Sequence, residues 1–205
     1  APRARGTGLS AMLAPLRTDP QLRRFVAARA LLTPTAYALP FLVMLSAAES
    51  PDRLGALGPL MLASALASIL SAWVWGRLAD RSSRRTLMAG GALAAVTLSG
   101  AALAGAMTGG LGGAAGAAAA VFVAQIAYEG VRLGRKTHLT DMSTNRTRAL
   151  NTALSNSAIG LVLLAGGGFG LLAEAIGLPA LLAVLAALCA AGAAAAARLR
   201  EVQAR

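Results

Sequence analysis

The chain has 205 residues, of which 57% are hydrophobic and only 13% are charged. A typical globular chain carries about 25% charged residues, so this one has too little polar surface to enclose its apolar side chains in water. The composition therefore excludes an ordinary soluble domain and indicates folding in an apolar solvent. The abundance of Ala and Gly is typical of helices that pack closely in lipid.

The net charge of +11 raises the question of nucleic-acid binding. Basic nucleic-acid binders carry their charge on a soluble face, usually with stacking aromatics or a recognisable fold. Here aromatics make up 4% of the chain, and the charges form short clusters between long apolar runs. That distribution is typical of membrane proteins, whose cytoplasmic loops collect Lys and Arg. We therefore expect no nucleic-acid partner.

Six segments are apolar enough and long enough to cross a bilayer, which takes about 20 helical residues at 1.5 Å each. We predict spans at about 25–48, 57–78, 86–107, 114–132, 150–173 and 178–197. Backbone groups in lipid must be satisfied within the segment, which favours helices over open strands. The predicted fold class is an all-α integral membrane protein with a six-helix domain over 25–200. Residues 1–24 are predicted to be a cytoplasmic linker and 201–205 a cytoplasmic tail.

Basic residues between the predicted spans fall almost entirely on one side of the bundle. That side receives Arg3, Arg5, Arg17, Arg23, Arg24, Arg81, Arg84, Arg85, Arg135, Lys136, Arg146, Arg148, Arg198, Arg200 and Arg205. The opposite side receives only Arg53, near Glu49, Asp52 and Glu174. Because cytoplasmic loops are enriched in Lys and Arg, we predict a multi-pass protein of the plasma or inner membrane with both termini cytoplasmic and lipid as its surroundings.

The segment after the second predicted span has a distinctive pattern, Gly76-Arg77-Leu78-Ala79-Asp80-Arg81-Ser82-Ser83-Arg84-Arg85. It resembles the signature loop of the major facilitator superfamily, Gly-x-Leu-small-Asp-Arg-x-Gly-Arg-Arg. The departure is Ser83, where the family usually has the Gly that serves a tight turn. We expect Gly76 to permit close helix approach and Asp80 to form charge-assisted hydrogen bonds with nearby Arg side chains. Alternatively, these Arg residues only fix the topology.

The resemblance implies that the chain is one six-span half of a twelve-span transporter. It further implies a latch between the two halves, made by the loop residues Gly76, Asp80, Arg81, Arg84 and Arg85. Residues 17–25 look like the end of the family's central cytoplasmic loop, and 146–152 resemble the loop before the eleventh span. We therefore favour the second half. The expected partner is the other six-span half, or a second copy of this one.

Polar residues line one face of the first predicted span. Arg29, Thr33 and Tyr37 lie at i, i+4 and i+8, which is one face of a helix. Pro34 and Pro40 interrupt this helix, and such breaks mark binding or mobile segments in transporters. Ionisable residues in lipid are costly and are therefore functional candidates.

A second polar face runs along the fourth predicted span, at Gln125, Tyr128, Glu129 and Arg132. The family resemblance implies that the first and fourth spans line the central cavity, so both faces are candidates for the substrate pathway. Arg29 and Glu129 lie at similar depth by helical rise, and we hypothesise an ion pair between them. The alternatives are a local contact of Glu129 with Arg132 and an Arg29 side chain that reaches the interface.

Other conspicuous residues are interpreted as structural. In the fifth predicted span, Asn151, Ser155 and Asn156 indicate interhelical hydrogen bonding. Trp73 and Trp75, near the cytoplasmic end of the second span, fit an interfacial aromatic anchor.

No enzymatic motif or cofactor pattern stands out. His138 is the single histidine, and we expect it to be a solvated loop residue. Cys189, the single cysteine, is expected to be a small buried side chain. We find no second histidine or acidic cluster for a metal site, no phosphate-binding loop and no nucleophile elbow.

The sequence leads to two hypotheses about function. The first is secondary active transport of small solutes by alternating access. The weak charge of the predicted cavity face favours an apolar or amphipathic compound, exported in exchange for protons. The second hypothesis is a six-span membrane scaffold or assembly protein without transport.

Overall fold

The computed structural model describes residues 16–48 and 57–203, and within these ranges every regular element is an α-helix. The helices run as α2 (Pro20–Leu32), α3 (Pro34–Ala47), α4 (Leu57–Arg81), α5 (Ser83–Thr108), α6 (Gly113–Met142), α7 (Arg148–Gly166), α8 (Gly168–Ile176) and α9 (Leu178–Ala197). They form six segments long and apolar enough to cross a membrane, with α2 and α3 as the first and α7 and α8 as the fifth. The expectations about Glu49, Asp52 and Arg53 lie outside the described residues.

The first helix begins earlier than predicted. Asp19 caps α2, because its Oδ1 accepts hydrogen bonds from the backbone N–H groups of Gln21 at 2.8 Å and Leu22 at 3.2 Å. Pro20 occupies the first helical position, where its missing N–H costs nothing. Part of the predicted linker 1–24 is therefore helical.

The fourth span is much longer than the predicted 114–132. Helix α6 has 30 residues and ends at Met142, whereas about 20 suffice to cross a hydrocarbon core. Its last turns extend past the apolar part of the helix. The residues from 133 to 142, predicted as loop, are thus part of the helix.

Two of the spans are interrupted. The first span breaks at Thr33, because Pro34 has no N–H to continue the hydrogen-bond ladder. Pro40 lies inside α3 without ending it. The fifth span is divided at Gly167, between α7 and α8.

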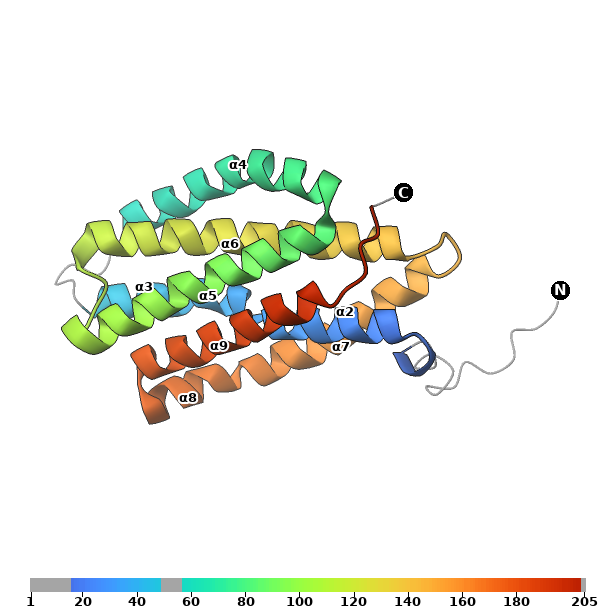
Figure 1. Ribbon diagram of the computed structural model, residues 1–205. Coiled ribbons are helices and arrows are strands. Elements are labelled where there is room, and N and C mark those ends of the chain that lie inside the picture. The colour runs from blue at the N-terminus through green and yellow to red at the C-terminus, as the bar shows by residue number, and fades with distance from the viewer. Residues whose placement is uncertain (1–15, 49–56, 204–205) are drawn as a thin grey trace.

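The bundle is organised around α5. This helix packs along α6 on one side and along α9 on the other, while α4 covers α6 (Figure 1). Helix α2 packs against α9 and α7, and α3 contacts both α6 and α9. The main core lies between α3, α5, α6 and α9, and a smaller apolar cluster lies at the end where α2 begins and α9 finishes.

Small residues bring the helices together. A Cβ placed on Gly90 of α5 would lie 2.9 Å from the backbone nitrogen of Val131 in α6, so the two backbones are in contact. Leu32, the last residue of α2, fits against Gly91 of α5 and Gly192 of α9, where added Cβ atoms would approach its side chain to 2.6 and 2.8 Å. This one Leu therefore fixes three helices at the point where the first span breaks.

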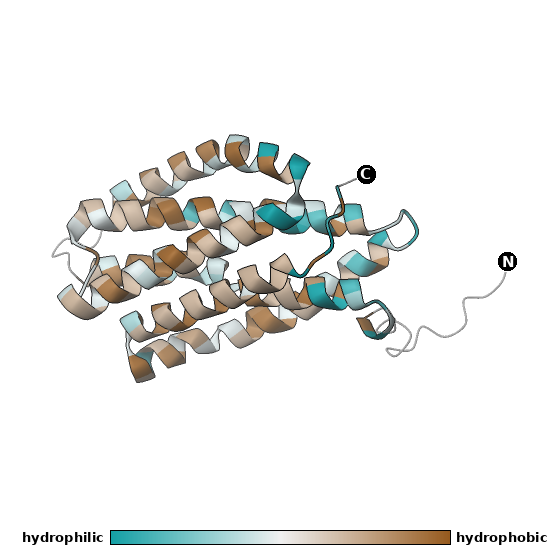
Figure 2. Ribbon diagram, viewed as in Figure 1, coloured by the Kyte–Doolittle hydropathy of each residue, from teal (hydrophilic) through white to brown (hydrophobic). Residues whose placement is uncertain are grey.

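Polar residues gather at one end of the bundle. Figure 2 shows hydrophilic residues at the end where α4 finishes, α6 projects and the C-terminus lies, while apolar residues dominate the rest. Because the helices alternate in direction, every described basic cluster falls at this end. We refer to it as the polar end.

The contact at Gly90 leads to a stability prediction. Gly90→Ala forces its methyl group against the α6 backbone, which cannot rotate away as a side chain can. We expect it to destabilise the bundle by about 1–3 kcal/mol, the usual cost of overpacking. The matched control is Gly100→Ala in the same helix, where nothing lies within 4 Å of the added Cβ. Unfolding of the purified protein by SDS, followed by circular dichroism, should show the loss for Gly90→Ala only, and equal midpoints would contradict this packing.

Candidate functional site

The loop that resembles the family signature is a one-residue turn. Helix α4 ends at Arg81 and α5 begins at Ser83, so Ser82 alone joins them, with an extended backbone at φ −165°. Its side chain caps α5 by accepting a hydrogen bond from the N–H of Arg85 at 3.0 Å. Ser83 is the first residue of α5 and has no positive φ, so Ser stands without backbone strain where the family pattern has Gly.

The charge cluster expected within this loop does not form. Asp80, Arg81 and Arg85 are exposed, and Asp80 makes no hydrogen bond or ion pair with the residues that the structure describes. Gly76 faces open space, so it does not mediate the expected close helix approach. Arg84 is the exception, because it pairs with Glu201 at 3.6 Å and donates to the Leu199 carbonyl at 3.4 Å.

The C-terminal segment fastens this turn to the bundle. Glu201 accepts a hydrogen bond from the Ser82 hydroxyl. Gln203 accepts one from the backbone N–H of Ser83, and it donates to the Ala79 carbonyl at 2.8 Å and to Asp141 at 2.9 Å. Residues 201–203, part of the predicted cytoplasmic tail 201–205, thus connect the end of α4, the start of α5 and the end of α6.

His138 also belongs to this assembly, which corrects the expectation of a solvated loop residue. It is fully buried on α6, its Nδ1 lies 3.0 Å from the Ser83 hydroxyl, and its ring stacks on Phe25 of α2 with centroids 5.5 Å apart. Helical spacing in the sequence would have indicated that His138 is buried. Ala127, Val131, Gly134 and His138 recur at spacings of three and four, so His138 continues the buried face of α6.

The polar faces of the first and fourth spans do meet, in part. Arg29, Thr33 and Tyr128 line one small cavity of about 150 Å³, together with Arg132 and Arg135. The cavity lies among α2, α3, α6 and α7, near the polar end. Three of the six predicted pathway residues therefore share one site.

The proposed ion pair between Arg29 and Glu129 is absent. Arg29 instead donates to the Ser155 hydroxyl at 2.6 Å and to the Asn156 side-chain oxygen at 3.0 Å, both on α7. Glu129 accepts from Arg132 at 2.7 Å, the local contact that was the alternative. The interhelical role expected for Ser155 and Asn156 is confirmed, because both accept hydrogen bonds from the guanidinium of Arg29.

Gln125 and Tyr37 bind neighbouring helices rather than the cavity. Gln125 is buried, and its Nε2 donates to Ser68 of α4 at 2.9 Å and to Glu129 at 3.2 Å. The Tyr37 hydroxyl donates to the Leu163 carbonyl of α7 at 2.8 Å, and its ring packs on Gly166. Both residues fix helix positions around the cavity.

The two tryptophans have different roles. Trp73 is exposed beneath the guanidinium of Arg77, 3.9 Å from its ring centre, as an interfacial anchor would be. Trp75 is buried, donates to the Ile126 carbonyl at 2.8 Å and packs on Gly130 of α6. The anchor interpretation is therefore wrong for Trp75, which joins α4 to α6.

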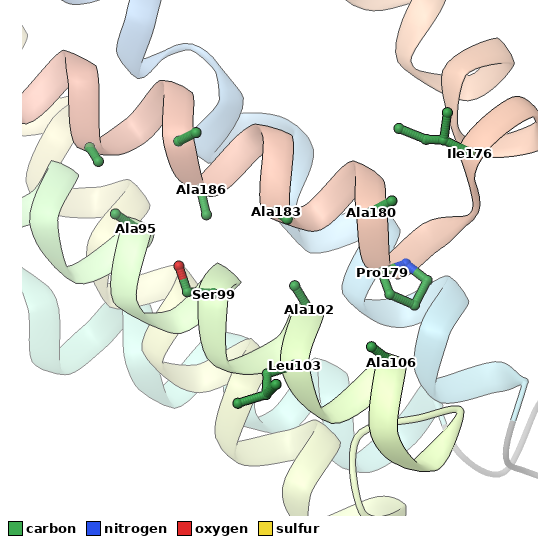
Figure 3. A pocket seen from close by; sticks show the side chains of 12 residues that line it. Ala95, Ser99, Ala102, Leu103, Ala106, Ile176, Pro179, Ala180, Ala183 and Ala186 are labelled. Carbon is green, nitrogen blue, oxygen red and sulfur yellow. The ribbon is translucent and has the colours of Figure 1, made fainter.

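An apolar groove of about 720 Å³ lies between α5 and α9. Figure 3 shows that small side chains such as Ala95, Ala102 and Ala183 line it and that Ser99 supplies a hydroxyl. None of its lining residues is charged. It lies away from the polar cavity and offers no group that could select a polar solute.

Comparisons with protein-family models, with curated proteins and with solved structures found no match to the chain. The family resemblance therefore depends only on the sequence patterns of the loop at 76–85 and of residues 17–25 and 146–152. Among the described residues no cluster of His, Cys, Asp and Glu could hold a metal ion.

The contact between Ser83 and His138 can be tested by stability. Ser83→Ala removes the hydroxyl and leaves Nδ1 of a buried imidazole without its partner, while the other ring nitrogen already has none. We expect a loss of about 1–3 kcal/mol, the cost of an unsatisfied buried polar group. Ser99→Ala, on the same helix but facing the apolar groove, should have no such effect. SDS-induced unfolding measures both, and a stable Ser83→Ala variant would show that this bond is dispensable.

Proposed function

We propose that the chain is one half of a secondary transporter that moves small solutes across a membrane by alternating access. The observation that carries this proposal is the pairing of its six spans. The third span (α5) packs against the sixth (α9), and the first (α2 and α3) packs against the fourth (α6). The third also packs against the fourth, as the sixth packs against the first.

The remaining main pairs follow the same rule. The second span (α4) packs against the fourth, as the fifth (α7 and α8) packs against the first. The second also contacts the third, as the fifth contacts the sixth. Exchanging the first three spans with the last three thus reproduces these main pairs. Because equivalent spans run in opposite directions, this is the pattern of an inverted repeat, on which many secondary transporters are built.

The exposed surfaces support a second bundle as partner. The equivalent second span (α4) and fifth span (α7 and α8) are the least covered of the bundle and expose apolar side chains such as Ile69, Leu70 and Leu164. A transport pathway needs walls on both sides, so we infer another six-span half or a second copy.

The turn between α4 and α5 fits the role of a latch to that partner. Asp80, Arg81 and Arg85 are exposed at the polar end, and Asp80 has no partner among the described residues. Their charges are therefore available to groups on a second bundle. A contact of this kind can form in one conformation and break in the other.

The distribution of Arg and Lys supports a bilayer location with the polar end in the cytoplasm. This predicts the labelling of single cysteines in a Cys189→Ala background. Asn145→Cys, exposed in the loop between α6 and α7, should react with an impermeant maleimide only after cells are permeabilised. Thr108→Cys, exposed at the opposite end, should react in intact cells. The reverse pattern would overturn the orientation, and equal labelling of both in intact cells would argue against a spanning bundle.

A transport prediction follows for Asp80. Inside-out vesicles from bacteria expressing the full-length protein should accumulate at least one solute from a defined mixture when a proton gradient is applied, as measured by mass spectrometry. Asp80→Asn should reduce the initial rate about tenfold or more, since it removes a charge from the latch while leaving abundance unchanged. The control is Glu174→Gln, which removes an exposed carboxylate from α8. If Asp80→Asn transports at the native rate, Asp80 is not part of a latch and belongs only to the charge cluster that fixes the topology.

The same experiment addresses the second hypothesis. A scaffold or assembly protein would insert with the same topology but accumulate no solute. Absence of gradient-dependent accumulation for correctly inserted protein would therefore favour the scaffold and contradict transport.

A further inference from the structure

The polar cavity near the cytoplasmic end is lined by three guanidinium groups. Arg29 reaches it from α2, and Arg132 and Arg135 reach it from α6. None of the residues that line it is acidic. Glu129 pairs with Arg132 and supplies one negative charge beside the cavity. Three like charges around about 150 Å³ repel one another, and one carboxylate cannot neutralise them.

The hydrogen-bond partners of Arg29 do not neutralise its charge. Its two hydrogen bonds go to neutral acceptors, Ser155 and Asn156, while its Nε is buried and has no acceptor. Arg135 has no hydrogen bond or ion pair among the described residues. A desolvated charge without a counter-ion is costly, so an anion entering the cavity would be stabilised by both residues.

The chemistry of the lining selects the kind of anion. Guanidinium groups present several N–H donors in a planar fork that matches carboxylate and phosphate oxygens. Tyr128 and Thr33 add polar side chains to the same wall. The positive lining disfavours metal cations, and the described residues offer no metal-ligand cluster.

We propose that this cavity binds the oxyanion group, phosphate or carboxylate, of a solute or of an anionic lipid. A volume of about 150 Å³ equals that of about five water molecules at ~30 Å³ each, so it accommodates a charged group and leaves any larger apolar part outside. As a substrate site it rests on the proposed function and narrows the expected amphipathic solute to an anionic one. Anion binding itself requires no transport.

Two experiments with the purified full chain determine whether the oxyanion comes from a soluble anion or from a lipid. In the first, the protein in neutral detergent is titrated with inorganic phosphate and with acetate at constant ionic strength in chloride, by isothermal calorimetry. In the second, the protein is purified from vesicles of phosphatidylcholine with phosphatidylglycerol, and retained lipid is measured by mass spectrometry. Binding in the first arm identifies a soluble anion, and retention of phosphatidylglycerol over phosphatidylcholine identifies a lipid headgroup.

Two variants locate the site. Arg135→Gln removes a charge that no described residue uses, so folding should be unaffected, and we expect about a tenfold loss of affinity or of retained lipid. Arg29→Gln should show a similar loss. The matched control is Arg24→Gln, which removes an exposed charge from the same helix as Arg29 and should change binding less than twofold.

The proposal is overturned if neither arm detects binding, or if Arg24→Gln weakens binding as much as Arg135→Gln. These outcomes are separate from those of the transport assay. A protein that transports but binds no oxyanion keeps the proposed function and loses this site. A protein that binds phosphate through Arg135 but transports nothing keeps the site and loses the function.

Discussion

Close approach of helix backbones is the constraint on which the rest of this bundle depends. Where Gly90 of α5 meets α6, the absence of a side chain lets the two backbones touch. Gly91 and Gly192 leave the space into which Leu32 fits, and Gly130 leaves the space for Trp75. Dispersion between surfaces packed this closely does not need water to drive it, which suits helices in an apolar solvent.

Polar side chains lie within this tightly packed bundle at the interrupted first span. Pro34 removes a backbone hydrogen bond immediately after Leu32 has fixed α2 against α5 and α9. One turn earlier on α2, Arg29 bonds to α7 and borders the polar cavity, which Leu32 also lines. A close apolar contact and a polar cavity thus share one short stretch of chain.

At the polar end, hydrogen bonds replace close packing as the cohesive interaction. Ser82 and Ser83 bind Glu201, Gln203 and His138, so the turn is connected to the C-terminal segment and to α6. Their side chains face inward, whereas the charges of Asp80 and Arg81 remain outside. The two sets of residues in this turn therefore have separate tasks. The serines hold the turn in place, and the charged residues are presented to whatever lies beyond the chain.

Much of the candidate site could be anticipated from local pattern. The stripe of Arg29 and Thr33 followed from helical spacing, and so did the polar face that carries Tyr128, because residues on one face of a helix share an environment. The partner of Arg29 could not be anticipated. Depth along a helix is readable from rise per residue, but rotation about the helix axis depends on which neighbour packs against it, and here α7 rather than Glu129 faces the guanidinium.

The sequence by itself determined the number of long apolar helices, the end at which the basic residues collect and the break at Pro34. Each of these follows from composition or backbone chemistry within a few adjacent residues. Only the tertiary structure decided that the ring of His138 stacks on Phe25 and that the C-terminal segment binds the turn between α4 and α5. Those features depend on contacts between residues more than fifty positions apart, and such contacts are fixed by how whole helices pack rather than by any local pattern.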